Sequence, residues 1–309
     1  MTSYVTIRRV GWQWLFIKPT AKRTMHDLIE SAKTTLNDIQ GKKQLPFSVY
    51  SSIKEQRILN APITKPLLIL VLAGVKQLGK DNEIVCSSGT FLFLSNSPTI
   101  DMRNIPDDND EYCAILIDFE YSDFNQFKQL DQLSQPAQST PARRNQGNKF
   151  FQGEIDMLLK KTLQQYIEWS AFAPPAAWHF RKQELLQLLY QSGHEEVSNI
   201  AEHPSLSHQL HNIISDDISG DWGVDRLAAK LAISESTLRR KLIAEGNNIL
   251  DIMNRTKLGH ALHLVQTTME PIGRIADRCG YQSQSRFTNK FKQQFGITPT
   301  ELRKTRMHD

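Results

Sequence analysis

The chain has 309 residues, 39% of them hydrophobic, and a formal net charge of +4, which fits about two globular domains of ordinary composition. No run approaches the roughly 20 apolar residues of a membrane helix, and Met1–Val10 is not followed by the apolar block of a signal peptide, so we expect a cytoplasmic protein with no membrane partner. The three cysteines (Cys86, Cys113 and Cys279) are far apart and form no CxxC pair, which argues against a disulfide framework or a zinc site.

The excess of positive charge lies in the last third of the chain. Residues 205–309 hold 15 Lys and Arg against 11 Asp and Glu, so the residues before them are neutral overall. Nucleic-acid binding depends on such charge, because each neutralised phosphate releases counterions. The excess is small, but its position favours a DNA-binding C-terminal region.

Residues 1–125 carry the pattern of a β-rich domain with one helix. Thr24–Ile39 places apolar residues at helical spacing. After Pro46, short runs rich in β-branched and apolar residues alternate with Gly, Asn, Pro and Asp, which predicts an antiparallel barrel or sandwich. The predicted strands are Phe47–Ile53, Pro66–Leu78, Glu83–Cys86, Thr90–Leu94, Ile100–Arg103 and Tyr112–Phe119.

Two helices are predicted after a polar linker. Residues 131–149 are poor in apolar side chains and rich in Gln, Ser, Pro and Asn, as in a loop. Phe150–Phe172 and Ala176–Gln191 each carry an apolar face, which includes Leu158 in the first and Phe180 in the second. These faces either cover the β domain or pair with the same helices of a second subunit, and the sequence leaves both arrangements open.

The last hundred residues contain an internal repeat, whose spacings agree apart from one extra residue in the turn and one before the closing glycine. The first copy runs through Leu227, Ala228, Ala232, Ile233, Ser234, Leu238, Leu242 and Gly246, and the second through Ile275, Ala276, Gly280, Tyr281, Ser283, Phe287, Phe291 and Gly296. In each copy a small alanine lets two helices cross closely, a sharp turn follows, and a serine caps the next helix. Two copies of this pattern predict a pair of helix-turn-helix units that bind DNA.

The outward faces of the two capped helices suit base recognition. They present Glu235, Ser236, Arg239, Arg240 and Glu245 in the first copy, and Gln284, Ser285, Arg286, Thr288, Asn289, Lys292 and Gln293 in the second. Arg pairs with guanine, and Asn or Gln with adenine, through two hydrogen bonds in the major groove. Between the copies, Ile249–Val265 reads as one helix about 26 Å long, a rod able to hold the two units about one DNA turn (roughly 34 Å) apart.

Residues from about 206 to 305 resemble the AraC/XylS family of transcription regulators. The family's signature in the second unit is similar to Ile272–Tyr281, followed by Ser283, Ser285, Phe287, Lys290–Lys292, Phe295–Pro299 and Leu302–Arg303. Lys257 stands where the family often has Arg, and Asn289 where it often has a basic base-reading residue, so the second helix is expected to bind more weakly or to read a different base. The resemblance implies the following base-facing positions: Ser236, Arg239 and Arg240 in the first helix, and Gln284, Ser285, Thr288 and Asn289 in the second.

Within the family, Asn212–Ser219, Trp222 and Met253–Arg255 are most similar to the enteric virulence regulators of the ToxT and Rns kind. Leu70–Leu78 and Gly89–Leu94 resemble the family's cupin-like effector domain. The resemblance implies an α+β chain of two domains. Residues 1–200 would form a cupin-like β-barrel or jelly roll with flanking helices, which binds an effector or dimerises. Residues 206–309 would form an all-α domain of two helix-turn-helix units joined by a linker helix.

The first domain offers little for catalysis. No histidine occurs between His26 and His179, so the barrel lacks the imidazole ligands that cupin metal enzymes use. No catalytic triad or carboxylate pair stands out, and the acidic turn Asp107, Asp108 and Asp110 reads as a solvated loop. We therefore expect no enzyme, no cofactor and no metal site.

Two hypotheses for control stay open. In the first, an apolar barrel interior binds a small molecule; the resemblance suggests a fatty acid whose carboxylate is held by Lys18, Lys22 or Lys65. In the second, the first domain binds a protein partner or a second copy of itself as a homodimer. The resemblance also implies activation of RNA polymerase at double-stranded promoter DNA, with repression as the alternative.

Overall fold

The computed structural model describes residues 6–10, 13–17, 21–39, 45–95, 97–109, 111–127, 150–201 and 205–306. The predicted linker, Lys18 and Asp110 lie outside the described residues, and the side chain of Lys22 is not described. None of the described helices has the length and apolar character needed to cross a bilayer. The first described element is an antiparallel pair, β1 (Thr6–Val10) and β2 (Gln13–Ile17), which the sequence pattern did not indicate.

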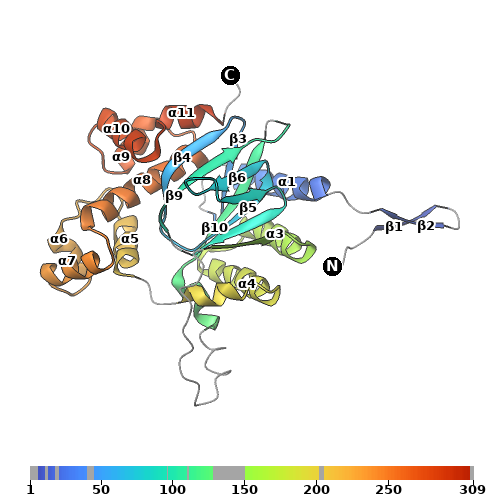
Figure 1. Ribbon diagram of the computed structural model, residues 1–309, viewed down its shortest axis with the longest axis horizontal. Helices are drawn as coiled ribbons and strands as arrows, with labels where there is room; N and C mark the ends of the chain where they lie inside the picture. Colours follow the sequence, from blue (N-terminus) through green and yellow to red (C-terminus); the bar gives the residue numbers. More distant parts are fainter. Residues whose placement is uncertain are drawn as a thin grey trace, which may run out of the picture.

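Two antiparallel sheets form the first domain (Figure 1), as the fold class predicted. One sheet has the strand order β11-β8-β5-β10-β3 and the other the order β4-β9-β6-β7. The strands are β3 (Ser48–Ser52), β4 (Gln56–Ile63), β5 (Leu67–Ala73), β6 (Val75–Leu78), β7 (Ile84–Ser87), β8 (Thr90–Leu94), β9 (Ser97–Ile105), β10 (Tyr112–Asp118) and β11 (Phe150–Glu154).

The five-stranded sheet is buried on both faces. In β5, Leu68 and Leu70 point to one core, and Ile69 and Val71 point to another, because successive side chains of a strand alternate between faces. The core of Ile69 and Val71 lies between the two sheets and includes residues of β6, β7 and β8. Burial on both faces explains why β5 reads as an unbroken apolar run instead of an alternating one.

Three helices cover the other face of the five-stranded sheet: α1 (Ala21–Ile39), α3 (Met157–Ser170) and α4 (Trp178–Gln191). Leu163 of α3 and Leu185 of α4 are fully buried in one core with β5, β8 and β10. The apolar faces of these helices therefore cover the β domain, which was one of the two predicted arrangements. Leu158 and Phe180 take no part in this cover, since they are 54% and 63% exposed.

Three element predictions differ from the structure. The predicted helix Phe150–Phe172 begins with strand β11, because these residues pair with β8 at the sheet edge and the helix starts after the Asp156 cap. The predicted strand Pro66–Leu78 divides at Gly74, whose φ is +72°. Strand β4 was not predicted, since Asn60 adopts a positive φ and the pairing with β9 shifts register, which breaks the strand pattern.

The second domain contains the following helices: α5 (Leu206–Asp216), α6 (Val224–Lys230), α7 (Glu235–Ala244), α8 (Ile249–Thr267), α9 (Ile272–Arg278), α10 (Gln284–Phe295) and α11 (Pro299–Lys304). They form two helix-turn-helix units, α6–α7 and α9–α10, with the long helix α8 between them (Figure 1). Each unit has its own core. That of the first contains Leu227 and Leu242, and that of the second contains Ile275 and Phe291.

Candidate DNA-binding interface

The two turns have the same backbone geometry. Ala232 in the first and Gly280 in the second have φ of +53° and +76°, so both turns pass through the left-handed region. Ile233 donates its backbone N–H to Ala228 O at 3.1 Å. Tyr281 makes the equivalent bond to the second buried alanine, Ala276, at 3.0 Å. The internal repeat in the sequence is thus a repeat in structure, although the alanine in the first turn carries strain that glycine avoids.

The serine before each recognition helix is a cap, as predicted. The hydroxyl of Ser234 accepts from Thr237 N at 3.2 Å, and that of Ser283 accepts from Arg286 N at 3.4 Å. Each cap also bonds the serine two residues later, Ser236 at 3.0 Å and Ser285 at 2.9 Å. These two candidate DNA contacts therefore lie in equivalent places, at the positive end of a helix.

The predicted reading faces are exposed. In α7, Ser236, Arg239 and Arg240 are exposed while Leu238 and Leu242 are buried. In α10, Gln284, Ser285 and Asn289 are exposed and Thr288 is half-buried. In the part of the chain that the structure describes, no carboxylate pairs with Arg239 or Arg240, so both guanidinium groups are available for a ligand.

The two units touch each other beside α8. This helix has 19 residues and begins at the cap Asn248, whose side chain accepts from Asp251 N at 2.9 Å. Lys257 of α8 donates to Gly220 O, in the loop between α5 and α6, at 3.4 Å. A Cβ at Gly280 would lie 3.1 Å from both Ser219 O and the Lys257 amine, so the turn of the second unit packs against the first. These contacts join the second unit to the loop that leads into the first.

Strand β4 docks on the second unit, away from its reading face. Ile58 and Ala61 share a core with Phe291 and Phe295. At the C-terminal end of α10, Gln294 donates its amide to Asn60 O at 3.0 Å. The docked residues lie at the opposite end of α10 from Gln284 and Ser285, so the β domain leaves the N-terminal half of the helix open.

The turn between β3 and β4, together with the start of β4, also holds the end of the chain. Ile53 donates its backbone N–H to Thr305 O at 2.8 Å, and the buried amide of Gln56 donates to Thr305 Oγ1 at 2.7 Å. Both bonds join residues about 250 positions apart in the sequence. The second helix-turn-helix unit is therefore held by backbone and side-chain bonds as well as by apolar packing.

Histidines line the seam between the domains. The ring of His208 bonds Thr64 O at 2.9 Å, and that of His263 bonds the hydroxyl of Tyr50 at 3.2 Å. Burial lowers the pKa of His211 to about 3 and that of His263 to about 4, so both rings are neutral at pH 7. The sequence offered no signal for these contacts, because each joins residues far apart in the chain.

Of the predicted effector residues, only Lys65 has a described side chain. Its amine pairs with Glu120, so its charge is already partnered. Lys18 lies outside the described residues, and for Lys22 the structure describes the backbone alone. The candidate lysines are thus not brought together by the part of the chain that the structure describes.

The barrel interior is less apolar than expected. Lys76 is 1% exposed and donates to Asn104 Oδ1 at 2.7 Å, and Asn104 in turn donates to Gln56 at 2.9 Å. Tyr112 lies beside the same amine, at 3.4 Å. Burial lowers the pKa of Lys76 to about 8. Within the described ranges no group of three or more His, Cys, Asp or Glu side chains is placed to hold a metal ion.

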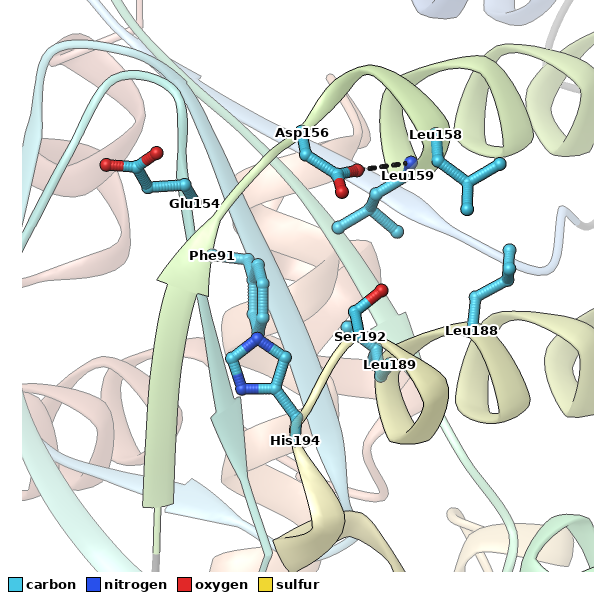
Figure 2. Close-up of a pocket in the computed structure, with 9 residues that line it drawn as sticks. All are labelled: Phe91, Glu154, Asp156, Leu158, Leu159, Leu188, Leu189, Ser192 and His194. Atoms are coloured by element: carbon cyan, nitrogen blue, oxygen red, sulfur yellow. Dashed lines mark hydrogen bonds between the residues drawn. The ribbon is translucent and has the colours of Figure 1, made fainter. Parts of the chain in front are cut away.

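A small pocket of about 230 Å³ lies where α3 and α4 meet the sheet edge. Figure 2 shows His194 beside Phe91, with Leu158 and Leu188 facing each other across the gap between the helices. A Cβ at Gly153 would lie 2.7 Å from the His194 ring, so this close packing depends on glycine. The sequence did not indicate that a histidine from beyond α4 reaches the barrel.

The fold and this interface define a class: a β-rich domain joined to a double helix-turn-helix domain. Residues 227–305 match a family model described as a helix-turn-helix domain. The C-terminal domain of this chain is similar to the DNA-binding domains of AraC/XylS-type regulators, as the sequence predicted.

Relatives of known name match the same region. The regulator GadX of Escherichia coli O6:H1 is 33% identical over 98 residues, which cover 32% of this chain and 36% of that protein. The regulator SirC of Salmonella typhimurium is 34% identical over 100 residues, which cover 32% of this chain and 34% of that protein. The match spans about a third of the length of these curated relatives.

Solved structures are similar over most of the chain. An apo variant of ToxT from Vibrio cholerae has a TM-score of 0.62 and 15% identity, and the match covers 86% of this chain and 99% of that one. Wild-type ToxT bound to an unsaturated fatty acid has a TM-score of 0.56 and 14% identity, over 84% of this chain and 95% of that one. This likeness shows that the two-domain α+β fold is shared.

Proposed function

We propose that the chain is a sequence-specific DNA-binding transcription regulator and not an enzyme. The observation that carries this proposal is the duplicated capped helix, with the same turn, the same cap and an exposed polar face in both copies. Polar outer faces are usually just solvated, but two equivalent ones on either side of α8 suit two adjacent major-groove segments. The named relatives are transcription regulators, which supports the same function.

The proposed base-facing residues are Ser236, Arg239 and Arg240 in α7, and Gln284, Ser285, Thr288 and Asn289 in α10. We take activation of RNA polymerase at promoter DNA in the cytoplasm as the action, with repression as the alternative. Residues 1–200 are the proposed control domain, and residues 206–309 the proposed DNA-binding domain. Because β4 contributes Ile58 and Ala61 to the core of the second unit, the full chain is the right material for DNA-binding experiments.

Substitution of a base-reading arginine tests the function. Arg240→Ala removes a side chain able to make two hydrogen bonds to guanine, so we expect specific binding to weaken by about 1–3 kcal/mol and binding to random DNA to change much less. Genome-wide mapping of bound sites supplies the specific duplex, and fluorescence anisotropy at physiological salt measures both affinities. The matched control is Lys80→Ala, which removes an exposed positive charge from the β domain. Equal losses on both DNAs after Arg240→Ala would refute base reading.

We further propose that the first domain controls DNA binding through a small, fatty-acid-like effector. The support is the fold shared with ToxT, which has been solved with an unsaturated fatty acid bound. The candidate carboxylate partners remain Lys18, Lys22 and Lys65, although the ion pair with Glu120 makes Lys65 a weaker candidate. Mass spectrometry of gently purified protein, with a thermal-shift screen of fatty acids, tests this control. No bound lipid and no shift would reject it.

The alternative control is by a protein partner or a homodimer. Exposed apolar side chains on α3 and α4, Leu158 and Phe180, favour such a contact. The molecular mass of the full chain in solution, measured by light scattering with and without fatty acid, distinguishes control by a small effector from control by self-association. Self-association that does not respond to ligand supports the alternative.

A further inference from the structure

Buried polar atoms without hydrogen-bond partners gather near the C-terminal ends of α8 and α11. The side chain of Gln266, in the last turn of α8, is 1% exposed, and in the described part of the chain neither its amide oxygen nor its amide nitrogen has a partner. The same holds for Nε and Nη2 of Arg303 and for Nε of Arg306. Buried polar groups are rarely left unpaired in proteins, so these atoms point to an additional binding partner.

Hydrogen bonds place the three side chains beside one another. Arg306 donates through Nη1 to Val265 O at 2.9 Å and to Thr268 O at 3.2 Å, the carbonyl groups on either side of Gln266 along the chain. The backbone N–H of Arg306 also bonds Arg303 O at 3.0 Å. Burial and the nearby charge of Arg303 both lower the pKa of Arg306, as expected for two neighbouring cations.

The β domain adds a buried hydroxyl group. Tyr50 of β3 bonds the His263 ring of α8 at 3.2 Å, so this side of the strand faces this side of the helix. Ser52 is two residues further along β3, and Gln266 three residues further along α8, so both lie on these facing sides. Ser52 is 1% exposed, and its Oγ has no partner among the described residues. The site therefore draws on β3, α8 and α11.

The two arginines bring positive charge that no carboxylate balances. Both side chains are half-buried, and in the ranges that the structure describes neither forms an ion pair. Burial lowers the pKa of Arg303, and the charge of Glu270 opposes this shift, but Glu270 forms its ion pair with Arg278, at 2.7 Å. Two cations held together and partly out of water repel each other, and an anion between them would remove that cost.

The donors suit an anion with several oxygen atoms. A guanidinium group offers parallel N–H groups that match two oxygens of a phosphate or sulfate. The Gln266 amide and the Ser52 hydroxyl are further donors. Ordered water would satisfy these hydrogen bonds but would not balance the charges. We propose that Arg303, Arg306 and Gln266 form a binding site for a free tetrahedral oxyanion of the phosphate or sulfate type.

The position of this oxyanion site separates it from the DNA-reading faces. Thr305, between the two arginines in the chain, bonds Ile53 and Gln56 of the β domain. The β domain docks at the opposite end of α10 from Gln284 and Ser285, so the site lies on the side of the second unit that faces the β domain. The occupant is therefore a free ion and not a phosphate of the bound duplex. Its role is to hold the end of α11 against β3.

Calorimetric titration of the full chain tests the site with sodium phosphate, sodium sulfate and sodium chloride at constant ionic strength. We expect phosphate and sulfate to bind at one site and chloride not to bind. Arg303→Gln removes one charge and should weaken phosphate binding at least about tenfold, as should Arg306→Gln. The matched control is Lys304→Gln, which removes the same charge from an exposed neighbour on α11 and should change the affinity less than about twofold.

Gln266→Glu tests the need for an anion in a second way. It puts a carboxylate beside the two arginines, so it should abolish phosphate binding and leave the thermal midpoint in chloride buffer at least as high as that of the original chain. A lower midpoint with phosphate binding intact would refute the inference, because a buried carboxylate that lacks a cation is unfavourable.

The other outcomes are equally distinct. Absence of phosphate binding by the full chain would mean that ordered water fills the site. Unchanged binding by Arg303→Gln would refute the site even if Arg306→Gln, which also loses its bonds to α8, does not fold. Weaker binding of the specific duplex by Arg303→Gln, with phosphate binding unchanged, would make Arg303 a DNA contact instead. Duplex binding by the original chain decides the proposed function independently.

Discussion

Gly259, in the middle of α8, gives a sharp test of how the two domains pack. Glycine in a helix interior is about 1 kcal/mol less favourable than alanine, so Gly259→Ala should stabilise an isolated helix. In the folded chain, however, a Cβ at this position would lie 2.9 Å from Pro62 Cγ, and the proline ring of β4 is rigid. The substitution therefore sets helix propensity against an interdomain clash.

The clash should outweigh the gain. Overpacking by one methyl group in a close contact costs about 1–3 kcal/mol, so Gly259→Ala is expected to change the free energy of unfolding by between about zero and a loss of 2 kcal/mol. In a Pro62→Ala background the ring is absent, and the same change should stabilise by about 1 kcal/mol. The interaction energy between the two positions is then about 1–3 kcal/mol.

Urea unfolding of the four proteins of this double-mutant cycle measures that energy. Gly273→Ala is the matched control, because its Cβ would meet the flexible end of the Gln284 side chain, 2.9 Å away, instead of the β domain. Gly273→Ala should change the free energy of unfolding by the same amount whether residue 62 is proline or alanine. If Gly259→Ala also has the same effect with and without Pro62, then α8 does not pack on β4 in solution, and the reasoning about the domain seam fails.

Three further predictions concern the same seam. Burial lowers the pKa of His211 and His263 from 6.5 to about 3 and about 4, so both are neutral when folded and the unfolded chain binds protons first. Stability should be full above pH 6.5 and be lost as the pH falls toward 4, by about 2 kcal/mol for each histidine between pH 7 and pH 5 in urea unfolding. Thr305→Val leaves the buried Gln56 amide without its acceptor and should cost about 1–3 kcal/mol, whereas Thr305→Ser should restore the bond. Phe291→Ala empties the core that β4 shares with α10 and should cost about 3–5 kcal/mol in thermal unfolding.

A specific result would contradict each of these three predictions. The double variant His211→Asn and His263→Gln should lose most of the pH dependence, and an unchanged slope would mean that other groups titrate. Equal stability of the valine and serine variants of Thr305 would show that the Gln56 bond contributes nothing. Ile243→Ala, at a side chain 72% exposed, is the control for Phe291→Ala, and similar losses from both would refute the shared core.

The double helix-turn-helix was predictable because its causes are local. A serine cap, a positive-φ turn and apolar side chains four residues apart act within about ten residues, so their spacing is readable in both copies. The same holds for α8. Its predicted range, Ile249–Val265, ends two residues before the observed C-terminal end at Thr267. The exposed polar faces followed directly, since the polar residues of α7 and α10 lie opposite Leu238 and Phe287.

The N-terminal domain was predictable only in part. Strand β5 was found as an apolar run, but whether an apolar segment is strand or helix depends on what lies beside it. Phe150–Glu154 is a strand because β8 offers hydrogen-bond partners at the sheet edge, and no feature of its own sequence indicates this. Strand β4 was missed because its bend at Asn60 fits a surface of α10 about 230 residues further along.

What the sequence determined by itself was therefore the class of the C-terminal domain and its two helices with exposed polar faces, through contacts between near neighbours in the chain. The tertiary structure decided how that domain is held: Ile58 in the core of the second unit, the bond from Gln56 to Thr305, and the close approach of Gly259 to Pro62. These features join residues roughly 190 to 250 positions apart. Their formation depends on the matching shapes of two folded surfaces, which no local pattern encodes.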